Sequence, residues 1–174
     1  GYLHGPNLND HMKQEHDWVA SDPGSLKSFN LSVHSAPDAL DTAKIDVAKA
    51  TQIYYAAMDS LSLCMFIFGP GNIYSFDEII AMVNAATGFN FNFEELMESG
   101  ERAIQVERKL FLQLGGKDSD FLTVMAQEIP EGPSKGARIN EDDFNHVRKY
   151  YYEIMGWDEK GWPKGETLEQ LGIM

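Results

Sequence analysis

A long run of apolar residues at spacings of three and four constrains this chain more than any other feature of its sequence. The run consists of Leu40, Ala43, Val47, Thr51, Tyr54, Met58 and Leu61. Such spacing places the side chains on one face of an α-helix. Pro37 suits a first helical position, and Asp38 and Asp41 favour the N-terminal end of a helix dipole. We therefore predict an amphipathic helix over about 37–62 whose apolar stripe packs into the core.

Two capping boxes predict where the next helices begin. Ser75 is followed three residues later by Glu78, and Asn92 is followed by Glu95 at the same spacing. Apolar residues at helical spacing follow each pair, and the first of these patterns ends at Gly88.

The second of these helices should reach the glycine pair at 115–116. Gly100 interrupts its pattern, at a cost of roughly 1 kcal/mol relative to alanine. The charged pairs at 101–102 and 107–108 are expected to be solvated surface groups. A buried tie between an arginine and a carboxylate is the rarer alternative.

The remaining sequence predicts short helices joined by loops. Residues 115–139 are rich in loop-forming residues around a possible short helix at 119–127. Asn140 caps another predicted helix, which Gly156 ends, and a short helix over about 166–171 closes the chain. No alternating strand pattern is present, so the predicted fold class is all-α.

Residues 1–36 show no sustained periodicity and predict a loop-rich N-terminal segment before a helical domain over 37–174. Three of the five histidines lie in this segment, at His4, His11 and His16. His11 and His16 are five residues apart, off the spacing that a helical metal pair uses. A polar wrapping segment is therefore favoured over a histidine metal site.

Charge and cysteine content limit the possible partners. Fourteen basic residues against 27 acidic ones give a formal net charge of −13 over 174 residues. This disfavours nucleic acid and anionic membranes, which both attract clustered Lys and Arg. No apolar run approaches the roughly 20 residues of a membrane helix.

The cysteine count and the first residue point to the setting of the chain. A single cysteine fits a reducing, cytoplasmic location. A start at Gly1 rather than Met suggests a fragment.

That cysteine, Cys64, lies five residues after Asp59 at the end of the long helical pattern. One thiolate cannot hold zinc or an iron–sulfur cluster alone. Cys64 is therefore either a buried small hydrophobic residue or one part of a metal site whose other ligands lie elsewhere. Asp59 precedes an apolar run, and a carboxylate in such surroundings needs a partner.

Four stretches together resemble one family, the tungsten-containing aldehyde:ferredoxin oxidoreductases. Residues 59–66, DSLSLCMF, resemble that family's Asp-x-x-Gly-Leu-Cys-x-Phe segment. Residues 100–108, GERAIQVER, resemble its Gly-Glu-Arg…Arg helix, and residues 132–136, GPSKG, its Gly-Pro…Gly turn. Residues 151–172 resemble its ending, Tyr-Tyr…Gly-Trp-Asp…Gly-x-Pro…Leu-Gly. The order and spacing agree over 55–174, whereas the preceding residues match weakly.

The resemblance implies a piece of a larger enzyme that oxidises aldehydes to carboxylic acids. Such enzymes hold tungsten through two molybdopterin dithiolenes, beside a [4Fe–4S] cluster, and pass electrons to ferredoxin. By the motif match, Cys64 would be the fourth cluster ligand, and Asp59 and Leu63 would face a pterin. Ser62 stands where the family has glycine, which puts close approach of the backbone to the pterin in doubt. His4 is the nearest candidate for the family's active-site histidine.

The family's other cluster cysteines and its N-terminal pterin-binding domain are absent from these residues. We therefore expect the isolated chain to be inactive and to bind neither tungsten nor a cluster. Its expected partners are ferredoxin, the remaining domains of the same enzyme and a small-molecule aldehyde. The alternatives are a non-catalytic interaction module that keeps the scaffold, part of a tungsten enzyme that reduces aromatic thioesters, and an unrelated helical domain.

Overall fold

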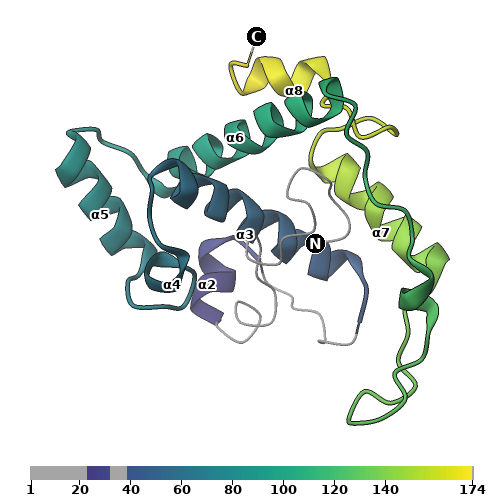
Figure 1. Ribbon diagram of the computed structural model, residues 1–174. Coiled ribbons are helices and arrows are strands. Elements are labelled where there is room, and N and C mark those ends of the chain that lie inside the picture. Colours follow the sequence, from purple (N-terminus) through teal and green to yellow (C-terminus); the bar gives the residue numbers. More distant parts are fainter. Residues whose placement is uncertain (1–22, 32–38, 174) are drawn as a thin grey trace.

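The computed structural model describes residues 23–31 and 39–173. In these ranges the chain is helical, and the predicted all-α class is confirmed (Figure 1). The helices are α2 (Pro23–Ser28), α3 (Thr42–Ser60), α4 (Met65–Phe68), α5 (Phe76–Thr87), α6 (Phe93–Gln113), the 3-10 helix η2 (Thr123–Ala126), α7 (Glu141–Ile154) and α8 (Gly165–Gln170). Extended pairing within the described residues is limited to one isolated bridge, between Trp157 and Pro163.

Helix α3 is the centre of the molecule and packs against α6, α7 and α4 (Figure 1). It begins at Thr42, so the predicted start at residue 37 was too early. Asp41 explains the difference. Its backbone is extended, with φ −137° and ψ 174°, and its side chain accepts a hydrogen bond from the Lys44 N–H at 2.9 Å. Asp41 is thus the N-cap that satisfies a free backbone donor of the first turn.

Helices α3 and α6 approach each other closely at Gly100. A Cβ atom built on Gly100 would lie 2.1 Å from the carbonyl oxygen of Ile53. Helix α6 continues through this position without a break, as the predicted helix toward residues 115–116 requires. The glycine lowers the intrinsic helix propensity of α6, but it allows the two backbones to pack in contact.

Helices α5 and α6 begin as the capping residues predicted. Both capping boxes are complete: the Ser75 and Asn92 side chains accept from backbone N–H groups, and Glu78 and Glu95 bond back to the cap residues. Gly88, with φ 75°, ends α5 in the left-handed conformation. These two helix starts therefore follow from local sequence alone.

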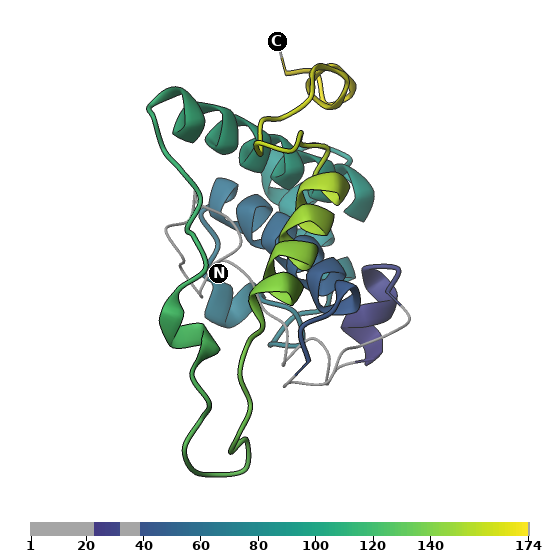
Figure 2. The ribbon, with the colours of Figure 1, turned by 90° about the vertical axis from the view of Figure 1, so that its right-hand side faces the viewer.

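In the C-terminal half, the predicted helices are present, but their type or bounds differ from the prediction. The helix expected at 119–127 is the single 3-10 turn η2, and α7 begins after its N-cap Asn140. Between η2 and α7 the chain extends away from the helices as a long loop, visible in Figures 1 and 2. Helix α8 is Gly165–Gln170, one residue earlier than predicted at each end.

Helix α2 lies within the segment for which the sequence predicted loops. Its Leu26 is buried against Val47 of α3, with Phe29 and Leu31 packed beside them. Pro23 occupies the first helical position, where its missing N–H costs nothing. Across the described residues, no helix has both the length and the apolar character needed to cross a membrane.

Candidate functional site at the end of helix α3

Cys64 lies in the connection between α3 and α4, and its side chain is exposed to solvent. The interpretation of Cys64 as a buried small hydrophobic residue is therefore wrong. Residues 61–75, which join α3 to α5 and contain α4, also expose large apolar side chains: Phe66 is 72% exposed and Ile73 is 67% exposed. A thiol in an exposed apolar surface is available to an external metal ion or cluster.

The backbone just before Cys64 is fixed by the C-terminal cap of α3. Ser62 adopts a left-handed conformation, with φ 58°. Its N–H bonds to the Asp59 carbonyl oxygen at 2.9 Å, and the Leu63 N–H bonds to the Met58 carbonyl oxygen at 2.9 Å. These two bonds form a Schellman motif, and Leu63 and Met58 belong to the same apolar cluster. Ser62 thus adopts a backbone conformation that favours glycine.

Replacing Ser62 with Gly should raise the free energy of unfolding by up to about 1.5 kcal/mol. Removing Cβ relieves roughly 1–2 kcal/mol of left-handed strain, and the extra freedom of glycine in the unfolded chain cancels roughly 0.5–1 kcal/mol of that gain. Urea denaturation of the chain measures the change. The control is Ser60→Gly, two residues earlier in the helical backbone of α3, which should lower stability. A loss of stability in both variants would contradict the strain assigned to Ser62.

Four of the five residues proposed for the site are adjacent to one another. Asp59 is exposed on the last turn of α3, and Ser62, Leu63 and Cys64 follow it in the connection to α4. His4 lies outside the described residues. No group of three or more His, Cys, Asp or Glu side chains in 23–31 and 39–173 is arranged to hold a metal ion.

Asp59 also borders a hollow of about 270 Å³ between α3 and α6. The other lining residues are Gln52, Ala56, Ser60, Ala103, Ile104 and Glu107. This hollow places polar groups of both helices beside the predicted cofactor-binding end of α3.

Two side chains that the sequence analysis did not single out hold the segment after Cys64. The Tyr54 hydroxyl donates to the Phe68 carbonyl oxygen at 2.6 Å, and Asn72 Nδ2 donates to the Met65 carbonyl oxygen at 2.9 Å. Burial, more than the neighbouring Tyr55, raises the pKa of Tyr54 well above its usual range. Its hydroxyl therefore stays protonated and remains a donor at any pH at which the fold is studied.

A second polar cluster surrounds Arg108, which is fully buried although surface exposure was predicted for it. Arg108 Nη1 and Nη2 bond to the Asp118 carboxylate at 2.5 and 2.6 Å, and Nε bonds to the Gly161 carbonyl oxygen at 2.8 Å. The guanidinium carbon lies 4.3 Å from the centre of the Trp157 ring. For Arg108, the rarer alternative of a buried salt bridge between an arginine and a carboxylate is therefore correct.

Neighbouring polar groups extend the cluster around Arg108. Tyr152 donates its hydroxyl to Asp118, and burial followed by this hydrogen bond raises the pKa of Tyr152 to about 12. Trp157 Nε1 donates to Gln105 Oε1 at 2.7 Å, and Gln105 Nε2 donates to the Met155 carbonyl oxygen at 2.8 Å. These bonds tie α6 to the turn after α7, which lies well apart from α4 in Figures 1 and 2. The cluster is part of the scaffold.

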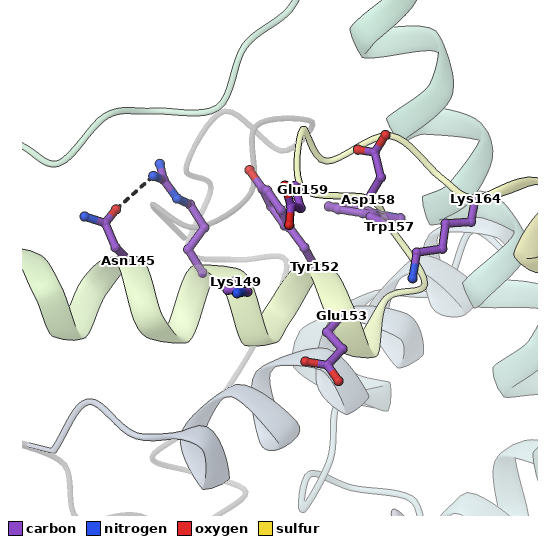
Figure 3. Close-up of a pocket in the computed structure, with 9 residues that line it drawn as sticks. Asn145, Lys149, Tyr152, Glu153, Trp157, Asp158, Glu159 and Lys164 are labelled. Carbon is purple, nitrogen blue, oxygen red and sulfur yellow. Dashed lines mark hydrogen bonds between the residues drawn. The ribbon is translucent and has the colours of Figure 1, made fainter.

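A wider hollow of about 620 Å³ lies beside this turn (Figure 3). Its lining residues are Asn145, Arg148, Lys149, Tyr152, Glu153, Trp157, Asp158, Glu159 and Lys164. Figure 3 shows the carboxylates of Glu153 and Asp158 pointing in opposite directions, while Asn145 bonds to Arg148. The charged groups do not converge on one point, so this hollow does not support a catalytic site.

Comparison with known proteins identifies relatives of this chain. Residues 2–173 match the family model for aldehyde ferredoxin oxidoreductase, domains 2 and 3. A Pyrococcus furiosus protein named aliphatic sulfonate oxidoreductase, WOR-like subunit, is 38% identical over 156 residues. The tungsten-containing aldehyde ferredoxin oxidoreductases of P. furiosus and Thermococcus kodakarensis are 33% and 32% identical.

The matches cover most of this chain but a minor part of each relative. They include 84%, 83% and 79% of the chain, and 24%, 23% and 22% of the three relatives. The chain therefore spans about a quarter of the length of these proteins.

Proposed function

This chain belongs to the aldehyde ferredoxin oxidoreductase family, and from that premise we propose that it is the C-terminal part of a tungsten–pterin, iron–sulfur oxidoreductase. The complete enzyme would oxidise aldehydes to carboxylic acids and pass the electrons to ferredoxin in the cytoplasm. Residues 37–174 would form its helical C-terminal domain, preceded by the segment 1–36.

The observation that carries this proposal is the exposed thiol of Cys64 at the family-like position of the motif. Thiolates are the usual ligands of iron–sulfur clusters, and a fully bound cluster of this class requires four of them. Cys64 would supply one, and the remainder of the enzyme would supply the others. If this is correct, the 174-residue chain by itself should hold no cofactor and should be inactive.

The end of α3 fits an adjacent pterin. Ser62 stands at the position of the family's glycine and keeps a left-handed backbone. With serine in place of glycine, the chain would therefore still follow a course that lets the backbone approach the pterin. Asp59 would accept hydrogen bonds from the pterin ring, and Ser62 and Leu63 would contact it. When bound, the tungsten–pterin group supplies the two-electron oxidation chemistry. His4 is retained as the proposed active-site histidine.

The apolar surface around Cys64 supports coverage by the other domains of the enzyme. Phe66, Ile67 and Ile73 are 72%, 39% and 67% exposed within the stretch between α3 and α5. Exposed apolar side chains that gather in this way are typical of an interaction site. Excluding water there would also help to set the potential of a nearby cluster.

The second candidate is an enzyme acting on aliphatic sulfonates. The relative that bears this name shares 38% of aligned residues with the chain, against 33% for the P. furiosus aldehyde enzyme. The substrate class would then differ, while the helical domain and the role of Cys64 would stay the same.

Both candidates are tested on the complete polypeptide that contains these residues, purified without oxygen from cells supplied with tungstate. We expect tungsten, about four iron atoms per chain and reduction of ferredoxin by aldehydes. Activity with aliphatic sulfonates alone would favour the second candidate. A folded protein without tungsten or iron would instead support a non-catalytic interaction module.

A further inference from the structure

The segment that carries Cys64 is fixed on both sides of the thiol. On the upstream side, the Schellman motif of α3 sets the backbone up to Leu63. On the downstream side, α4 consists of only four residues. A single helical turn is not stable in water by itself, because nucleation costs more than one turn of hydrogen bonds returns. Other parts of the chain must therefore hold α4.

Side chains and turn N–H groups bind the carbonyl oxygens of α4. The Phe68 oxygen accepts from the Tyr54 hydroxyl at 2.6 Å. The Met65 oxygen accepts from the Gly69 N–H at 2.8 Å and from Asn72 Nδ2 at 2.9 Å. The bond from Gly69 is the ordinary helical one, so Asn72 adds a second donor to the Met65 oxygen. The Tyr54 hydroxyl binds the last carbonyl oxygen of α4, which has no partner within the helix.

The same turn holds the backbone of Cys64 itself. The Cys64 carbonyl oxygen accepts from the N–H groups of Ile67 and Phe68, both at 3.0 Å. Cys64 has φ −76° and ψ 120° as the N-cap of α4. Any loosening of α4 would therefore release the residue that carries the thiol.

Gly69 makes room for the Asn72 side chain. A Cβ atom on Gly69 would lie 2.6 Å from the Met65 carbonyl oxygen and 2.8 Å from Asn72 Nδ2. Both distances are too short for carbon, so a side chain at residue 69 would break the bond between Asn72 and Met65. Two independent substitutions, at residues 69 and 72, can therefore disrupt the same hydrogen bond.

We propose that Asn72 is a positioning residue for Cys64, holding α4 so that the thiol points in one direction before the cluster binds. This role of Asn72 rests on the proposed function, in which Cys64 is a cluster ligand. Outer groups that fix a metal ligand pre-organise it and tune the metal centre. Asn72 is exposed, so its amide can be changed with little effect on the core.

The first test uses the full 174-residue chain with a nitroxide attached to Cys64, its only cysteine. Label mobility reports backbone motion near the thiol on the nanosecond timescale. Asn72→Asp keeps the side-chain size and removes the amide donor. Gly69→Ala disturbs the same bond together with the backbone of α4, because its Cβ would also meet the Met65 carbonyl oxygen. Both variants should lose the immobilised component of the paramagnetic resonance spectrum. Asn90→Asp is the matched control, since it adds the same charge at an exposed asparagine that donates no side-chain hydrogen bond within the described residues.

Circular dichroism of each variant separates local loosening from unfolding. Asn72→Asp is expected to keep the helical signal and the melting temperature of the parent while the label becomes mobile. A label spectrum unchanged in Asn72→Asp would overturn the positioning role, whatever the spectrum of Gly69→Ala.

The second test places Asn72→Asp, Asn72→Ala and Asn90→Asp in the complete enzyme. The reduced-cluster resonance spectrum and the midpoint potential should shift for both variants of Asn72, with or without the added charge, and stay unchanged for Asn90→Asp. Normal values in Asn72→Asp, together with iron loss in Cys64→Ala, would overturn the positioning role and leave the proposed function intact. Unchanged iron in Cys64→Ala would overturn the proposed function. The label experiment would still test whether the Asn72 hydrogen bond fixes α4.

Discussion

Replacing Cys64 with Ala in the complete enzyme should remove most of the cluster iron and the reduced-cluster resonance signal. The variant lacks one of the four thiolates that a cluster of this class requires. The fold should be unaffected, because Cys64 is exposed and surface substitutions usually change stability by less than about 0.5 kcal/mol. Loss of iron with a normal melting temperature is therefore the expected pair of results, and iron analysis with paramagnetic resonance measures the first.

Two further variants make this result specific. Cys64→Ser keeps the size of the side chain but replaces the sulfur ligand, so it should resemble Cys64→Ala. Ser60→Ala changes an exposed side chain on the last turn of α3 and should retain full iron content. If Cys64→Ala kept a normal resonance signal and normal activity, Cys64 would not be a cluster ligand.

The helix starts show what local sequence determines here. The capping boxes at Ser75 and Asn92 need partners only three residues away, and both formed as predicted. The start of α3 was misplaced because Asp41 was counted as a helical residue, although its side chain is the cap that begins the helix. Neighbouring residues decide these features, so the sequence is sufficient when each candidate cap is considered.

Long-range partners explain why the sequence did not predict the packing role of Gly100 or the burial of Arg108. The role of Gly100 depends on the carbonyl of Ile53 in another helix. The burial of Arg108 depends on Asp118, Trp157 and Gly161, which lie in segments that local patterns do not bring together. Helical periodicity shows which face a residue occupies, but not whether another segment will cover that face.

The sequence proposes a position for the candidate site but does not give its geometry. The motif around Cys64 is the basis for proposing this segment, whereas the exposure of the thiol and the left-handed backbone of Ser62 required the structure. Asn72 was missed because its only signal in the sequence is that it follows a Gly-Pro-Gly turn. Its hydrogen bond joins residues seven apart, a spacing that belongs to no regular element.

Replacing Arg108 with Ala should lower the free energy of unfolding by about 3–5 kcal/mol, because it leaves a buried carboxylate without its cation. The Arg108 side chain is 0% exposed and that of Asp118 is 10% exposed, so solvent would do little to compensate. The variant also loses the hydrogen bond to Gly161 and the contact with the Trp157 ring. Chemical denaturation followed by circular dichroism measures the loss.

Two comparisons distinguish the cost of leaving a buried charge unpaired from the cost of losing any ion pair. Arg138 and Glu128 form a pair at 3.6 Å whose side chains are each 62% exposed, so Arg138→Ala should cost less than about 1 kcal/mol. The double variant Arg108→Met, Asp118→Leu removes both charges together and should recover much of the loss, since apolar replacements of a buried pair are often nearly neutral. An Arg108→Ala variant as stable as Arg138→Ala would show that the cluster around Arg108 is not what ties α6 to the turn after α7.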